Sequence, residues 1–191
     1  VMNLYSSLIN QKAIDKSLNP SYVDYITTEK DYLDSKKFQK DQEFWEQFFP
    51  KTPELAKISY QPITTDFTAV RQVFHLEEKL YQQILDFCAQ NHCSIYVFFM
   101  SIFFIYLAKI NNIESPIIGT PVLNRSNFRE KNTAGMFIST VPFKADVLPN
   151  LTFVDFLKNI VELQMSIYRH QKYPYSLLLE ELKKKYNYTQ N

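Results

Sequence analysis

The sequence predicts an α/β fold of the layered α+β kind, in which a mixed β-sheet packs against helices. Apolar residues recur at helical spacing in several segments, whereas three short segments have the composition or the alternation of strands. The two kinds of segment alternate along 191 residues, of which 46% are hydrophobic. That length and composition are sufficient for one substantial core or two small ones.

The first part of the chain is predicted to be helical. Apolar residues spaced by three and four positions predict a helix already under way at Val1, and a short aromatic segment follows at 21–26. The charged stretch 31–47 predicts an exposed helix. Three prolines come after it and oppose regular structure, because proline lacks a backbone donor. We therefore divide the chain into 1–62, the end of a first lobe with a linking helix, and 63–191, most of a second lobe.

The second part is predicted to begin with a strand at 70–76 and a helix at 80–88. Ser94 is a suitable N-cap for the next helix. The apolar run of that helix, 95–108, is interrupted only by Ser101, which predicts burial on all sides. Because the run is shorter than the roughly 20 residues that cross a bilayer, no membrane span is expected.

Two more strands are expected further along. The first, 116–118, is short and β-branched, as a central strand would be, and Gly119 is expected to end it. The second covers 137–147, where apolar residues alternate with polar ones. Thr152 and Asp155 then have the spacing of a capping box and predict the start of a long amphipathic helix.

Composition excludes several classes of function. Two glycines in the whole chain are too few for a phosphate-binding loop or a dinucleotide fingerprint, and the usual zinc-protease, C-x-x-C and G-x-S-x-G patterns are missing. A net charge of +1 gives no reason to expect nucleic acid as a partner. The N-terminus has no secretory signal pattern, so a cytoplasmic location is expected.

Cys88 and Cys93, with His92 beside the second, invite comparison with a metal site. They supply fewer ligands than zinc requires and too few cysteines for a disulfide framework. We expect both thiols to behave as small buried hydrophobes.

Two motifs in order are more specific than either alone. The segments Ile118-Gly119-Thr120-Pro121-x-x-Asn124-Arg125 and Gly135-Met136-Phe137-Ile138-Ser139-Thr140-Val141-Pro142 resemble the core signature of condensation domains of nonribosomal peptide synthetases. Two more segments agree with that family: Tyr22-Val23-Asp24-Tyr25 followed by Phe44-Trp45, and His170-Gln171-x-Tyr173-Pro174-Tyr175. The resemblance covers essentially the whole chain.

The resemblance implies a chloramphenicol-acetyltransferase-like fold of two lobes. It implies an acyltransferase that joins a donor acyl or peptidyl group to the amine of an acceptor amino acid, both held as thioesters on carrier proteins. The implied partners are these carrier proteins and neighbouring adenylation domains. The phosphopantetheine belongs to the carriers, and neither a directly bound cofactor nor a metal is expected.

The same resemblance implies an incomplete domain. The family's catalytic H-H-x-x-x-D-G motif lies just upstream of a helix like the one at Val1, and the family's last strands follow the region of Lys185. We therefore assign no catalytic residue to the chain and expect it to be inactive alone, because a positioned base contributes roughly 10²- to 10⁴-fold in rate.

Arg125 is the strongest candidate for active-site support. By resemblance, it is expected to form an ion pair with the aspartate of the catalytic motif and so to hold that motif's loop. The plainer alternative is a surface arginine after a loop. His170 ends an amphipathic helix, and we expect it to cap the C-terminus of that helix rather than to act in catalysis.

A second group of residues is expected to border the substrate tunnel. At one of these positions the chain departs from the family pattern, because Ser139 stands where asparagine is common. The alternative is a turn that contacts no ligand. The tunnel candidates are Gly119, Thr120, Pro121, Gly135, Met136 and Ser139.

Three rival interpretations stay open. An epimerisation domain of the same superfamily would deprotonate an α-carbon, although the Thr120-Pro121 and Gly135-Met136 pairs favour condensation. A catalytically dead relative would recruit a carrier or another enzyme. A generic α/β core with accidental motif matches is the third.

Overall fold

A computed structural model describes residues 2–12, 20–54, 56–58 and 68–187. The chain divides into two compact units that interleave along the sequence. Unit 1 comprises Val1–Pro50, Pro121–Val141 and His170–Asn191, and unit 2 comprises Lys51–Thr120 and Pro142–Arg169. The lobe boundary predicted at residue 62 concerns a larger domain and stays a prediction.

Two helices of unit 1, α2 (Tyr22–Leu33) and α3 (Lys36–Phe48), begin at serine side-chain caps. Ser21 Oγ accepts a hydrogen bond from the backbone N–H of Val23, at 3.1 Å, where α2 begins, and Ser35 Oγ accepts one from Phe38, also at 3.1 Å, where α3 begins. The single helix predicted over 31–47 is therefore wrong, because the Ser35 cap separates two helices. The helices of this unit are α1 (Met2–Ile9), α2 (Tyr22–Leu33), α3 (Lys36–Phe48), α6 (Phe128–Asn132) and α8 (Tyr175–Tyr186).

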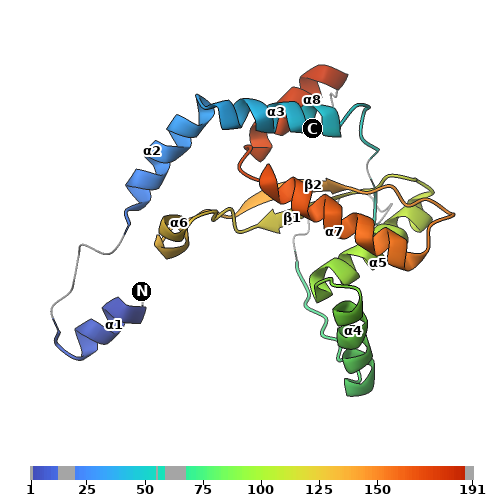
Figure 1. The fold of residues 1–191 in the computed structure, drawn as a ribbon, viewed down its shortest axis with the longest axis horizontal. Helices are drawn as coiled ribbons and strands as arrows, with labels where there is room; N and C mark the ends of the chain where they lie inside the picture. The colour runs from blue at the N-terminus through green and yellow to red at the C-terminus, as the bar shows by residue number, and fades with distance from the viewer. Residues whose placement is uncertain (1, 13–19, 55, 59–67, 188–191) are drawn as a thin grey trace. The chain divides into compact units, whose positions relative to one another are not determined.

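The core of unit 1 lies where α3 and α8 run side by side (Figure 1). Trp45 and Phe49 are almost fully buried there. Tyr186 Oη donates to the backbone carbonyl of Phe49 at 2.6 Å, and Gln42 Nε2 donates to the Glu181 carboxylate at 2.8 Å. Apolar burial and cross-helix hydrogen bonds together hold the two helices.

Unit 2 is built on α4 (Glu78–Gln90), α5 (Ile95–Asn111) and α7 (Phe153–Arg169). Both predicted caps are confirmed. Ser94 Oγ accepts from the N–H of Val97 at 3.2 Å, and Thr152 Oγ1 accepts from the N–H of Asp155 at 3.2 Å.

Helix α5 is buried on one side only, so the prediction of burial all round is wrong. Phe104 is fully buried, but Tyr96, Phe99 and Tyr106 are each more than 40% exposed on the opposite face. No single helix of the described residues has the length and apolarity for a membrane span; α4 and α5 meet that test only as a pair bent by 98°.

The sheet of the described residues has two strands, β1 (Ile117–Val122) and β2 (Ser139–Lys144). Hydrogen bonds from Ala145 N to Pro116 O and from Val147 N to Glu114 O, at 3.3 and 2.8 Å, extend the ladder and give it antiparallel register. The observed sheet is thus smaller than the mixed sheet expected. Gly119 was predicted to end this strand. That prediction is wrong, because Gly119 lies within β1.

The strand predicted at 70–76 is wrong. The segment has no regular secondary structure, and Phe74 is 84% exposed. Its composition suits a half-buried pleated surface, but a strand also needs a neighbour for its backbone groups, and among the described residues only β1 and β2 pair.

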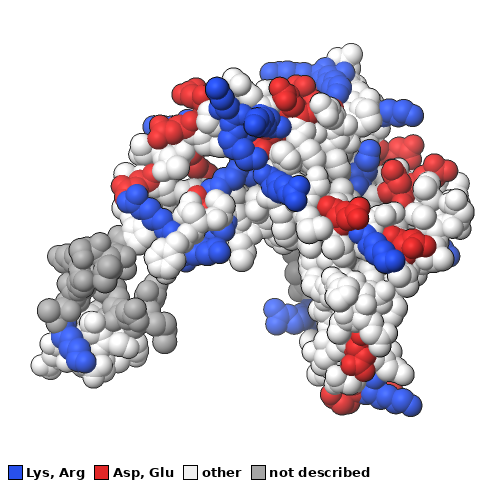
Figure 2. Space-filling model, in the orientation of Figure 1, with Lys and Arg blue, Asp and Glu red and all other residues white. Residues whose placement is uncertain are grey.

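Charge is mixed on the face of the molecule seen in Figure 2, where Lys and Arg are interspersed with Asp and Glu. The described residues on that face form no single-sign field of the kind that attracts a polyanionic partner.

Candidate functional site

The guanidinium of Arg125 is the centre of the candidate site, in unit 1. It donates hydrogen bonds to the backbone carbonyls of Glu130, of Thr133 at 2.7 Å and of Gly135 at 3.1 Å. Its Cζ lies 3.9 Å from the centroid of the Phe137 ring. Arg125 therefore fixes the path of its own loop through charge-assisted hydrogen bonds and a cation–π contact.

The loop that Arg125 binds is also held by hydrogen bonds among its own residues. Asn127 Oδ1 accepts from the N–H of Glu130 at 2.8 Å and so caps α6. Glu130 Oε2 accepts from both the N–H and the hydroxyl of Ser126, at 2.6 and 3.0 Å. We call residues 125–137 the Arg125 loop.

The tyrosines of the Tyr22-Val23-Asp24-Tyr25 motif pack on the Arg125 loop. Tyr22 Oη donates to the carbonyl of Met136 at 2.7 Å. The Tyr25 and Phe137 rings have centroids 4.1 Å apart. Asp24 binds Arg129 at 2.8 Å, but both side chains are largely exposed, so this ion pair contributes little to stability.

The His170-to-Tyr175 motif also contacts the Arg125 loop. Lys172 Nζ lies 2.5 Å from Glu130 Oε1 and 5.6 Å from the centroid of the Tyr25 ring. Burial alone would raise the pKa of the Glu130 carboxyl, but the hydrogen bonds from Lys172 and Ser126 outweigh it and lower that pKa.

Asp41, like Glu130 and Lys172, was not predicted as a site residue from the sequence. It is 0% exposed, and its carboxylate binds Lys37 Nζ at 2.5 Å, His170 Nδ1 at 2.6 Å and Tyr32 Oη at 2.8 Å. Burial and the hydrogen bond to Asp41 raise the pKa of Tyr32. The side chain of His170 therefore binds Asp41 of α3. The sequence predicted that it would cap the end of α7 instead.

The contacts of His170 continue into the core of unit 1. Its ring stacks on Phe44 with centroids 3.9 Å apart, and its carbonyl accepts from Trp45 Nε1 at 3.1 Å. The sequence pattern of a helix end indicated none of this, because the partners lie about 125 residues away in sequence.

The tunnel candidates occupy the strands and the Arg125 loop. Thr120 is buried, while Gly119 and Pro121, on the other face of β1, are exposed. Gly135 and Met136 are exposed in the Arg125 loop, and Ser139 begins β2 half-buried. Their place along a tunnel stays a prediction.

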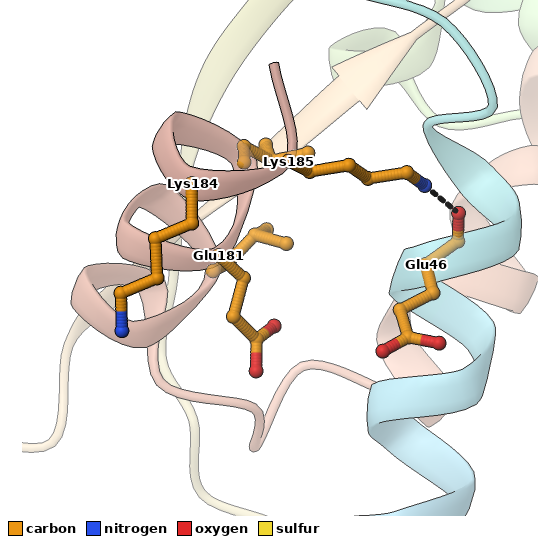
Figure 3. Close-up of a pocket in the computed structure, with 6 residues that line it drawn as sticks. Glu46, Glu181, Lys184 and Lys185 are labelled. Atoms are coloured by element: carbon orange, nitrogen blue, oxygen red, sulfur yellow. Dashed lines mark hydrogen bonds between the residues drawn. The ribbon is translucent and has the colours of Figure 1, made fainter. Parts of the chain in front are cut away.

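The hollows of unit 1 differ in size. One of about 50 Å³ lies among α2 and the Arg125 loop, too small for a substrate. A larger one of about 530 Å³ lies between α3 and α8, where Glu46, Glu181, Lys184 and Lys185 line it (Figure 3). Lys185 Nζ donates to the carbonyls of Glu46 and Phe49 at the end of α3, which is a helix-capping role.

The two thiols belong to unit 2. Cys88 is buried, as predicted, and Cys93 is half-buried. Burial and the neighbouring Cys88 raise the pKa of the Cys93 thiol to about 11. Among the described residues, no group of three or more His, Cys, Asp and Glu side chains could hold a metal ion.

Comparison with known families decides what kind of domain carries these motifs. The sequence model of the Condensation domain family matches residues 1–191. The chain belongs to the condensation domain family. Among curated relatives of this condensation domain chain, surfactin synthase subunit 1 of Bacillus subtilis (strain 168) is 34% identical over 184 residues. Tyrocidine synthase 2 of Brevibacillus parabrevis is 24% identical over 194 residues.

The matches cover most of this chain but a small part of its relatives. They include 96% and 100% of the chain, and 5% of each of the two synthases. The first condensation domain of the CDA synthetase superposes with a TM-score of 0.80 at 16% identity, covering 94% of this chain and 40% of that one. The condensation domain of the monacolin K polyketide synthase superposes with a TM-score of 0.75 at 21% sequence identity, and the match covers 93% of this chain and 43% of that one. The chloramphenicol-acetyltransferase-like α+β fold is thus confirmed.

A methyl group at position 135 is expected to destabilise unit 1. A Cβ on Gly135 would lie 2.8 Å from Cγ of the Tyr22 ring, closer than carbon atoms approach. Gly135→Ala should lower the free energy of unfolding by about 1–3 kcal/mol. Urea unfolding followed by Trp45 emission measures it. In a Tyr22→Leu background the loss should shrink; an undiminished loss would contradict the steric cause.

The contribution of Glu130 to stability is expected to depend on pH. Its folded-state pKa is lowered below the ordinary value of 4.5, so the unfolded state takes up the proton first as pH falls. The stability that Glu130 provides is present in full above its unfolded pKa and is lost as pH falls through its folded pKa. Urea midpoints of wild type and Glu130→Gln should therefore converge as pH falls from above the ordinary value of 4.5 through the lower folded-state pKa. A constant difference would contradict this assignment.

Proposed function

We propose that this chain is part of an acyltransferase domain that forms an amide bond between a donor acyl or peptidyl thioester and the amine of an acceptor aminoacyl thioester. One observation carries the proposal: in a chain of the condensation domain family, the motif segments around residues 22–25 and 170–175 both contact the Arg125 loop, which lies within the motif segment 118–142. Convergence of distant motifs at one loop is typical of a functional site rather than of general packing.

Arg125 has a supporting role in this proposal. Held by three carbonyls and by Phe137, its guanidinium is pre-positioned to bind the aspartate of the family's H-H-x-x-x-D-G motif. The neighbouring residue Asn124 gives a reason to expect that another segment of the complete domain packs beside Arg125. Its buried Oδ1 has no hydrogen-bond partner within the part of the chain that the structure describes, and such atoms usually have one.

The partners that follow from this function are carrier proteins and adenylation domains. The acyl groups would arrive on phosphopantetheine arms attached to the carriers, so the chain itself would need neither a bound cofactor nor a metal. Gly119, Thr120, Pro121, Gly135, Met136 and Ser139 would border the path of these arms. The reaction would take place in the cytoplasm.

Two rivals are separated by one experiment. The protein encoded by the parent gene, including the codons just upstream of Val1, is incubated in D₂O with carrier-bound thioesters. Amide product that needs both thioesters, with no deuterium at the acceptor α-carbon, supports condensation. Deuterium incorporated with a single thioester supports epimerisation, and carrier binding with neither product supports recruitment.

A further inference from the structure

The proposed function assigns no chemical step to the His170-to-Tyr175 motif, yet Lys172 of that motif contacts the Arg125 loop directly. Lys172 Nζ and Glu130 Oε1 are 2.5 Å apart, and their side chains are 22% and 7% exposed. Breaking such a pair leaves an uncompensated charge away from water. The two side chains are therefore tightly constrained by each other.

Glu130 transmits that constraint to Arg125. Its carboxylate oxygen Oε2 closes the turn at Ser126, and its backbone carbonyl accepts from the Arg125 guanidinium. A displacement of Glu130 would thus move both the start of the loop and one of the three carbonyls that hold Arg125.

Lys172 is itself fixed on both sides. His170, two residues before it, binds the buried Asp41 of α3, and Tyr173, directly after it, stacks on Phe38 of α3 with centroids 5.1 Å apart. The backbone that carries Lys172 is consequently attached to α3. The ion pair of Lys172 with Glu130 therefore connects the Arg125 loop to α3 through a short stretch of backbone.

We infer that Lys172 is a positioning residue: its ion pair with the buried Glu130 fixes the Arg125 loop relative to α3 and so holds the Arg125 guanidinium in place. The inference rests on the proposed function only where it predicts how Lys172 affects activity. The loop geometry itself is testable without any substrate.

Hydrogen exchange measured by mass spectrometry on the 191-residue chain tests the geometry. Lys172→Met keeps the aliphatic stem and removes the charge, and it should raise exchange of amides 126–137 about tenfold or more, while α3 and α5 keep wild-type rates. Lys172→Arg retains the charge and should restore most of the protection. Lys131→Met, an exposed change in the same loop, is the matched control and should alter nothing.

Two results would overturn the inference. One is unchanged exchange of 126–137 in Lys172→Met; the other is an equal rise across α2, α3 and the loop, which would assign the pair to general stability. Glu130→Gln, which keeps the contacts to Ser126, should loosen the same amides and provides a second variant if Lys172→Met folds poorly.

Activity gives a separate readout. In the complete domain, Lys172→Met should lower kcat for amide formation about tenfold with KM nearly unchanged, and Lys172→Arg should recover most of it. A wild-type domain that forms no amide would refute the proposed function while leaving the exchange result intact. Loop loosening without any change in kcat would overturn the positioning role alone.

Discussion

Asp41→Ala is expected to lower the free energy of unfolding of the chain by about 3–5 kcal/mol, because it removes the buried acceptor shared by three donors. Lys37, His170 and Tyr32 would lose their common partner, and the attachment of the His170 segment to α3 would be lost with it. Trp45 is the sole tryptophan and is buried in this unit, so its emission during urea unfolding reports the change.

The matched control for this change lies two residues further along the same helix. Glu43 is exposed, and Glu43→Ala should change the free energy of unfolding by no more than about 0.5 kcal/mol. Similar losses for the two variants would show that Asp41 has no special place in unit 1.

Arg125→Ala is expected to reduce amide formation by the complete domain roughly 100-fold, because small displacements of a catalytic loop have effects of that size. Arg125→Lys should rescue little, since an ammonium group cannot reach three carbonyls and stack on Phe137 at once. The measurement is kcat/KM with carrier-loaded thioesters.

Arg129 provides the control for Arg125. It lies four residues further along the loop, is exposed, and binds only the exposed Asp24 in the described contacts. Arg129→Ala should keep kcat/KM within about twofold, as expected for an exposed ion pair. An Arg125→Ala enzyme with the activity of Arg129→Ala would favour the interpretation of Arg125 as an ordinary surface residue.

Local signals predicted the helices of unit 2 well. The caps at Ser94 and Thr152 act within three residues, so the sequence alone specifies where α5 and α7 begin. The strand at 70–76 was not predictable in this way, because a strand depends on a neighbour that is distant in sequence. The exposure of one face of α5 was missed for the same reason, since burial is a property of the surroundings.

In the candidate site too, the contacts that are local in sequence were predictable and the long-range contacts were not. The motif around Arg125 is readable in the sequence, and its carbonyl partners lie only five to ten residues away. Asp41 and His170 are 129 residues apart, and Glu130 and Lys172 are 42 apart. Neither pair has a local signature. Asp41, within a charged helix, looks like any solvated carboxylate until the fold buries it.

Amide formation is the most direct test of the central claim, that this chain is part of a condensing acyltransferase. The protein encoded by the parent gene is mixed with one acyl-loaded and one aminoacyl-loaded carrier, and the acceptor carrier is analysed by mass spectrometry. The account predicts an acceptor thioester extended by the donor acyl group, which disappears when the second histidine of the upstream motif is replaced. A folded protein that binds both carriers and leaves both thioesters unchanged would contradict it.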